Sequence, residues 1–250
     1  MKLNPLKLTQ LKTLQIILFF QIWLLVPCLI FGQTSSSKTE LLTYEVNPEK
    51  QTLRLFWKDD NGQIINDFAS LNQYVSSKGE TLIFAMNGGM FTQSYDPLGL
   101  YMEAGTELHP LNQVQKAYGN FYLQPNGVFF LAKDGKAGVC KSTDFEKIKN
   151  VEYATQSGPM LVIDGKMHPA FNEGSPNVHI RNAVGILPNG NVLFVMSKRR
   201  MNFYELASFF MEKGCKNALY LDGFVSRTYL PAQDWEQMDG RFGVMIGEVK

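Results

Sequence analysis

The chain has 250 residues, a formal net charge of +1 and 19% charged residues. So small a net charge excludes the broad basic surface typical of nucleic-acid binding or of attachment to anionic membranes. Two cysteines lie beyond the N-terminal region, Cys140 and Cys215. Two cysteines make no disulfide framework, and in apolar surroundings they can be one disulfide or two buried thiols.

The first 32 residues have the layout of a secretory signal peptide. Three lysines precede an almost wholly apolar run, 14–31, and Gly32 comes just before the polar stretch "QTSSSKTE". We expect cleavage after Gly32 and export to the periplasm or the medium. The alternative is an uncleaved anchor, because 18 apolar residues nearly span a bilayer. No second hydrophobic span follows, so we expect membrane contact through this segment alone.

From residue 40 the pattern is rich in strands. Strands are expected on both sides of Asn47-Pro48, then a helix over 66–77 and a buried strand "TLIFAM" over 81–86. Three hairpins are expected further on, and their turns are placed at Pro125-Asn126-Gly127, Asp164-Gly165 and Asn189-Gly190.

The clearest helix is expected over 202–213. Asn202 is a good N-cap with Glu205 three residues on, and Gly214 ends the helix. The strand "ALYL" over 218–221 and the closing segment "RFGVMIGEV" complete the chain. We therefore predict an α+β fold over residues 40–250: a mixed, largely antiparallel sheet system with a few packed helices, in a single domain.

Two buried strands end in the same way. "TLIFAM" is followed by Asn87-Gly88 and "ALYL" by Asp222-Gly223. This echo suggests that two strand ends converge on one site, where Gly88 and Gly89 let the backbone approach a ligand. The alternative for Asn87 is a tight turn, because Asn-Gly is a common hairpin signal.

Other side chains give weaker signals. Ser157 could present a nucleophilic hydroxyl, but it lacks the glycines of a nucleophile elbow, and a serine in a turn is favoured. The three histidines are too far apart for a zinc site, and we expect neither metal nor cofactor. His179, close to Arg181, is the best histidine candidate, whereas His109 and His168 precede prolines in polar stretches expected to be exposed.

Glu103 and Asp222 are carboxylates at strand ends suited to acid–base work.

The ordered segments "FAMNGGMF", "GLYMEAG", "NFYLQPNGVFFL", "ATQSGPMLVIDG", "RNAVGI", "ELASFF" and "ALYLDGFVS" resemble the phosphodiester glycosidase family over residues 40–249. The resemblance implies an exported hydrolase that cleaves a sugar-1-phosphodiester bond. This chain departs from the family at Phe224, where a glycine is usual, and at Asn182, where a hydroxyl residue is common.

The resemblance also suggests the site. Its catalytic candidates are Asp222 and Glu103 as carboxylates and Arg181 as the phosphate ligand. Its substrate-binding candidates are Asn87, Gly88, Gly89, Asn126, Ser157, Gly158, His179, Phe224 and Ser226. The expected partner is a carbohydrate or glycosyl phosphate, with no nucleic acid. Two alternatives stay open: a non-catalytic domain that binds glycans or envelope polymers, and a serine hydrolase that uses Ser157.

Overall fold

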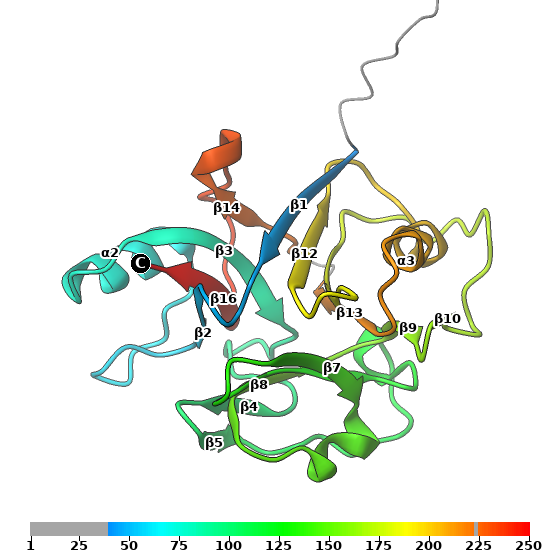
Figure 1. Ribbon diagram of the computed structural model, residues 1–250, viewed down its shortest axis with the longest axis horizontal. Coiled ribbons are helices and arrows are strands. Elements are labelled where there is room, and N and C mark those ends of the chain that lie inside the picture. The colour runs from blue at the N-terminus through cyan, green and yellow to red at the C-terminus, as the bar shows by residue number, and fades with distance from the viewer. Residues whose placement is uncertain (1–39, 223–224) are drawn as a thin grey trace, which may run out of the picture. The chain divides into compact units, whose positions relative to one another are not determined.

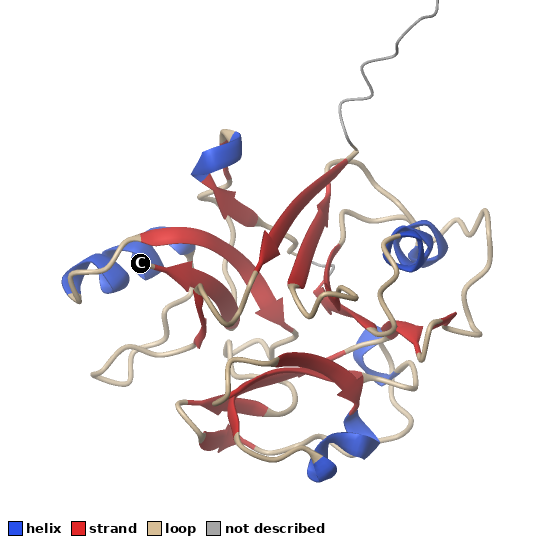
Figure 2. Cartoon of the chain, viewed as in Figure 1, coloured by secondary structure: helices blue, strands red, loops and turns tan. Residues whose placement is uncertain are grey.

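The computed structural model describes residues 40–222 and 225–250, so the expected signal peptide lies outside the described residues. The described strands form three sheets (Figures 1 and 2). The first contains β1 Leu41–Val46, β9 Met160–Ile163, β10 Lys166–Met167, β11 Asn182–Ile186, β12 Val192–Ser197 and β13 Ala218–Asp222. The second contains β2 Thr52–Phe56, β3 Leu82–Gly89, β14 Thr228–Leu230, β15 Trp235–Glu236 and β16 Val244–Val249. The third contains β4 Tyr101–Glu103, β5 Thr106–His109, β6 Gly127–Ala132, β7 Ala137–Lys141 and β8 Val151–Ser157.

Every ladder between described strands is antiparallel. The strand orders are β1-β12-β11-β13-β9-β10, β15-β14-β3-β16-β2 and β5-β4-β8-β6-β7. The largely antiparallel fold is therefore confirmed, although the described part contains none of the parallel pairing that a mixed sheet implies. Fewer of the paired strands are joined by hairpins than we expected. β1 pairs with β12 and β3 pairs with β16, although the members of each pair lie far apart in the sequence.

The three sheets pack their inner faces onto one shared core. Phe84 of β3, Phe129 of β6 and Phe194 of β12 come from different sheets and belong to the same buried cluster. The outer face of each sheet has its own cover, which is α3 Phe203–Glu212 on the first, α2 Phe68–Ser77 on the second and the 3₁₀ helix η2 Ser142–Lys147 on the third. Figure 1 shows α2 and α3 on well-separated sheets.

Both predicted helices are confirmed. Helix α3 has the expected capping box, in which the Asn202 side chain accepts from the backbone of Glu205 and the Glu205 side chain accepts from the backbone of Asn202. In α2 the cap is Asp67, whose carboxylate accepts from the backbone of Ser70. In the described residues no helix is long and apolar enough to cross a membrane.

Two of the predicted hairpins are confirmed, and one is wrong. β9 and β10 pair across Asp164-Gly165, and β11 and β12 pair across Asn189-Gly190. Before the predicted turn at Pro125-Asn126-Gly127, however, the chain forms a 3₁₀ helix, η1 Asn120–Tyr122, and β6 pairs with β7 and β8 instead. The side chain of Asn126 explains the difference, because its Nδ2 donates to the carbonyl of Phe121 at 3.1 Å and holds the preceding segment in a compact loop.

The two cysteines are both free thiols in the structure. Cys215 is buried beneath α3, and Cys140 is partly buried on β7 of the third sheet. Burial raises the pKa of the Cys140 thiol to about 12 and that of Cys215 to about 11. Of the two alternatives given by the sequence, the structure has the pair of thiols.

Candidate active site

The ends of three strands from two sheets meet in a buried network of polar side chains. Asn87 near the end of β3, Asn182 at the start of β11 and Asp222 at the end of β13 are at most 6% exposed. Nδ2 of Asn87 donates to Oδ2 of Asp222 at 3.2 Å. Nδ2 of Asn182 donates to Oδ1 of Asn87 at 2.9 Å and to its carbonyl at 2.8 Å. We call Asn87, Asn182 and Asp222 the strand-end network.

The backbone also takes part in this network. The amide of Asp222 donates to Oδ1 of Asn182 at 2.9 Å, and the amide of Arg227 donates to Oδ1 of Asn87 at 2.9 Å. Each amide side chain therefore both donates and accepts, so its orientation is fixed by its neighbours. Buried polar groups satisfied in this way form a rigid arrangement.

A β-bulge directs Asp222 toward this network. Asn182 pairs with Asp222 while Ala183 pairs with Tyr220, so Leu221 has no partner in the ladder. Tyr220 and Ala183 both face α3, and strict alternation would place Asp222 on that face with Tyr220. The extra residue instead brings Asp222 to the face of Asn182. Bulges commonly re-aim one side chain in this way beside functional sites.

Two serines brace the same region. The hydroxyl of Ser157, at the end of β8, donates to the carbonyl of Leu221 at 2.5 Å. The hydroxyl of Ser226 lies 2.6 Å from the carbonyl of Asp222 and 3.3 Å from that of Ile180. Ser157 thus links the third sheet to the first, and its position in a strand corrects the expectation of a turn. The tight-turn alternative for Asn87 is also wrong, because Asn87 lies within β3.

Arg181 directly precedes Asn182 in the sequence, but its guanidinium bonds to residues outside the strand-end network. Its side chain is 0% exposed. Nε donates to the carbonyl of Met201 at 2.8 Å, and Nη2 donates to the carbonyl and side chain of Asn177. The guanidinium carbon lies 3.7 Å from the centre of the Phe203 ring. Burial lowers the pKa of Arg181. Nη1 of Arg181 and the hydroxyl of Tyr220 are buried without a hydrogen-bond partner.

Glu103 is not brought to the network. It lies in β4, and Tyr101 pairs with Thr155 there, so Glu103 is level with Tyr153. That position is four residues, or about 13 Å, along β8 from Ser157. Oε2 of Glu103 accepts from the hydroxyl of Tyr101 at 2.6 Å. Burial raises the pKa of Glu103, and the Tyr101 hydrogen bond only partly offsets this shift.

The predicted glycines have close protein neighbours. A Cβ atom on Gly88 would meet Ile246 at 2.5 Å, and one on Gly89 would meet the hydroxyl of Thr155 at 2.5 Å. A Cβ atom on Gly158 would lie 2.7 Å from Asn126, whose own side chain bonds to Phe121 and Ser142. The structure therefore gives these glycines and Asn126 a packing role that brings the strand ends together.

The histidines differ from one another in exposure. His168 is 2% exposed, which corrects the expectation of a surface position. Nδ1 of His168 accepts from the amide of Ala170, and Nε2 faces the carbonyl of Gln124 at 2.9 Å, as suits a neutral ring. Burial lowers its pKa. His179 is exposed and forms a β-bridge with Met201. Phe224 lies outside the described residues.

The sequence model of the phosphodiester glycosidase family matches residues 80–242. The chain belongs to this family. It is also 37% identical over 188 residues to "Uncharacterized protein YigE" of Escherichia coli K12, covering 75% of this chain and 73% of that protein.

Two solved structures show a similar fold. One is the catalytic domain of zebrafish N-acetylglucosamine-1-phosphodiester alpha-N-acetylglucosaminidase, auto-inhibited by its pro-peptide. It is 16% identical, has a TM-score of 0.54, and the match covers 85% of this chain and 84% of that one. The other is a "Putative exported protein" of Burkholderia pseudomallei, which is 10% identical with a TM-score of 0.54 and coverage of 83% and 73%.

Asn182 is a central member of the strand-end network, which the sequence did not indicate. In the sequence it stands out only as a departure from the hydroxyl residue common in phosphodiester glycosidases. A hydroxyl has a single hydrogen, so it could not donate to both oxygens of Asn87 as the Asn182 amide does. Its position directly after Arg181, a candidate phosphate ligand, was the sequence feature that could have indicated it. Nothing in the sequence indicates that the backbone of Arg227 donates to Asn87, because every residue except proline has the same main-chain N–H.

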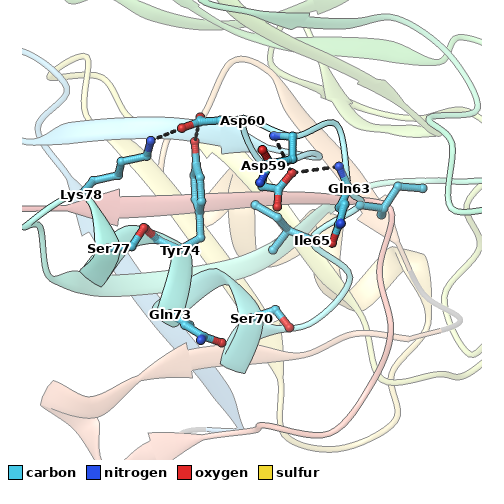
Figure 3. A pocket seen from close by; sticks show the side chains of 11 residues that line it. Asp59, Asp60, Gln63, Ile65, Ser70, Gln73, Tyr74, Ser77 and Lys78 are labelled. Atoms are coloured by element: carbon cyan, nitrogen blue, oxygen red, sulfur yellow. Dashed lines mark hydrogen bonds and ion pairs between the residues drawn. The ribbon is translucent and has the colours of Figure 1, made fainter.

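A separate pocket of about 430 Å³ lies beside α2 (Figure 3). Its lining includes Asp59, Asp60, Gln63, Tyr74 and Lys78, and none of the predicted site residues. Tyr74 and Lys78 both donate to the carboxylate of Asp60. Within the described residues, no group of three His, Cys, Asp or Glu side chains is placed to hold a metal ion.

Proposed function

We propose that this member of the phosphodiester glycosidase family is an exported hydrolase that cleaves the bond between a sugar C1 and a phosphodiester. In this reaction the C1–O bond breaks, its electron pair leaves with the phosphate oxygen, and water supplies the new C1 hydroxyl. The second proton of water goes to solvent or to the departing phosphate. The products are a free sugar and a phosphate monoester.

The position of Asp222 is the observation that carries the proposal. Its carboxylate is 6% exposed at the end of β13, and a bulge and the amide of Asn87 direct it to a junction of strand ends. A transition state of this reaction carries positive charge on the sugar ring. A negative charge fixed in a largely desolvated position stabilises such a charge more strongly than one in water.

The amides of the network have a supporting role in this proposal. Asn87 donates to Asp222, and Asn182 fixes both Asn87 and the backbone of Asp222, so the carboxylate keeps its direction without reorganisation during the reaction. We therefore assign the charge-based role to Asp222 rather than to Glu103, which bonds to Tyr101 on another sheet.

A serine hydrolase mechanism has no comparable support. The hydroxyl of Ser157 donates its one hydrogen to the carbonyl of Leu221, and no described hydrogen bond links it to a histidine or carboxylate. Activation of a serine nucleophile requires such a base within hydrogen-bond reach. Export is supported by the signal-like pattern of residues 1–32.

The test is an assay of the chain without residues 1–32. Methyl phosphodiesters of glucose 1-phosphate and N-acetylglucosamine 1-phosphate are incubated with the protein, and release of free sugar is followed. We expect release from at least one, with methyl phosphate as the second product. Binding of these compounds without any release, over long incubation and a pH range of about 5 to 8, would overturn the proposal in favour of a glycan-binding domain.

A further inference from the structure

The buried position of Arg181 raises the question of what holds the phosphate, on the assumption that the proposed function is correct. Two of its three nitrogens already donate to Met201 and Asn177, and the whole side chain is 0% exposed. A phosphodiester carries its negative charge into the site and needs donors that it can reach. Such donors must therefore come from exposed side chains close to the strand-end network.

The loop after β12 supplies exposed cations that directly follow the strand paired with the backbone of Arg181. Lys198, Arg199 and Arg200 are consecutive and exposed. The strand that leads into them ends at Ser197, whose hydroxyl accepts from the backbone of Arg181 at 2.8 Å. Figure 1 shows this loop running from the end of β12 to the start of α3.

His179 lies beside the same loop. Its amide and carbonyl both bond to the backbone of Met201, the residue after Arg200. The next residue, Ile180, lies with its carbonyl 3.3 Å from the Ser226 hydroxyl, which is in turn 2.6 Å from the carbonyl of Asp222. A short series of contacts thus joins His179 and Arg200 to the end of β13.

The cations of this loop differ in whether they are already neutralised. Arg199 is engaged by Glu40 at 2.8 Å and by Glu205 at 2.9 Å. Among the described residues, neither Lys198 nor Arg200 has an ion-pair partner. Lys198 instead lies 5.2 Å from the centre of the Trp235 ring. Glu40 and Glu205 thus both pair with the middle cation, Arg199, and the outer two cations are available to a ligand.

We propose that Lys198 and Arg200 form a basic rim that binds the phosphate half of the substrate, with His179 beside them as a hydrogen-bond donor. The rim selects glycosyl phosphodiesters over neutral glycosides. Arg181 does not contact the phosphate, and its guanidinium holds the end of the loop by donating to the carbonyl of Met201. The rim binds by charge and hydrogen bonding and takes no part in bond cleavage. Its contribution is to affinity and substrate choice.

The experiment compares the double variant Lys198→Gln/Arg200→Gln with the wild type on two substrates of the same sugar: a methyl sugar-1-phosphodiester and the neutral 4-nitrophenyl glycoside. We expect KM for the phosphodiester to rise about tenfold, the scale of two partly exposed charge contacts, with kcat within about twofold. KM for the neutral glycoside should not change. The control Lys50→Gln removes an exposed cation that follows the far end of β1 and should alter neither value.

Salt dependence gives a readout that a merely structural role would not move. The wild-type KM for the phosphodiester should rise with ionic strength, because salt screens exposed charges, and the double variant should show a flatter response. An unchanged KM for the phosphodiester, or an equal loss on the neutral substrate, would overturn the rim.

A calorimetric titration with glucose 1-phosphate tests the rim even if the wild type cleaves nothing. Absence of cleavage contradicts the proposed hydrolase, whereas binding that weakens about tenfold in the double variant still supports an anion-binding rim. Equal binding by both proteins, or no binding by either, would overturn the rim itself.

Discussion

The strand-end network and the pocket beside α2 are both polar, but they are built in opposite ways. In the pocket, Asp60 bonds to Tyr74 and Lys78, which are 14 and 18 residues away, and its side chain is 62% exposed (Figure 3). In the network, Asp222 bonds to Asn87, 135 residues away, and is 6% exposed. The pocket is an open hollow at the surface, whereas the polar groups of the network are buried and bonded to one another.

This contrast is the reason for preferring the strand-end network over the open pocket as the candidate active site. An exposed ion pair gains little, because water and salt screen both charges. A carboxylate held by an amide donor in a desolvated position acts more strongly on a nearby charge than one in water. Bringing three strand ends together also requires the global fold, whereas the pocket needs only one helix and the loop before it.

The largest expected difference is in catalysis. Asp222→Asn should lower turnover of a sugar-1-phosphodiester by about two orders of magnitude or more, because it removes the charge but keeps the shape. Its thermal midpoint should stay close to that of the wild type, because Asn can accept the same hydrogen bond. The matched variant Asp60→Asn, at the pocket, should leave turnover within about twofold.

Turnover and thermal midpoint are measured on the same preparations of both variants. Near-normal turnover of Asp222→Asn at an unchanged midpoint would rule out its catalytic role. A loss of turnover in Asp60→Asn as large as in Asp222→Asn would remove the distinction between the two regions.

The next largest difference is in stability. Asn182→Ala removes two donated hydrogen bonds and one accepted bond in a fully buried position, so that both oxygens of Asn87 lose a donor and the amide of Asp222 loses its side-chain acceptor. We expect a loss of about 2–4 kcal/mol in the free energy of unfolding. Tyr74→Phe, which removes a bond to Asp60 at the exposed pocket, should change it little. Urea denaturation of the two variants provides the comparison, and equal losses would contradict it.

The smallest expected effect concerns the pH dependence of stability, and it has opposite signs for the half-buried carboxyl of Glu103 and the exposed carboxyl of Asp60. Burial raises the pKa of Glu103, so the unfolded chain ionises first and the native state loses stability as pH rises from about 4.3 through the raised value. The Lys78 hydrogen bond lowers the pKa of Asp60, so the stability that it contributes is lost as pH falls below about 3.9.

Urea midpoints of the wild type, Glu103→Gln and Asp60→Asn are followed from about pH 3 to pH 7. The wild type should lose stability relative to Glu103→Gln as pH rises, and relative to Asp60→Asn as pH falls. If the stability difference from the wild type changed with pH in the same direction for both variants, burial would not be what sets the pKa of Glu103.

The local elements were predictable because their signals are local. Helix α3 was fixed by its capping box and apolar stripe, and the β11–β12 hairpin by Asn189-Gly190. The hairpin predicted over 120–135 was wrong for a tertiary reason, since the Asn126 side chain bonds back to Phe121 and β6 pairs with strands further along the chain. The sequence also could not place His168, because proline and polar neighbours suggest a surface loop while the fold buries the ring.

For the candidate site, the sequence by itself determined which residue types end the strands: Asn87 after one apolar run and Asp222 after another, in the order that marks the family. Only the tertiary structure decided that the two side chains meet, that a bulge at Leu221 directs Asp222 toward the network, that Asn182 joins them, and that Glu103 and the Arg181 guanidinium lie elsewhere. The physical reason is that strand register and β-bulges, which choose the face of each side chain, depend on partners distant in sequence.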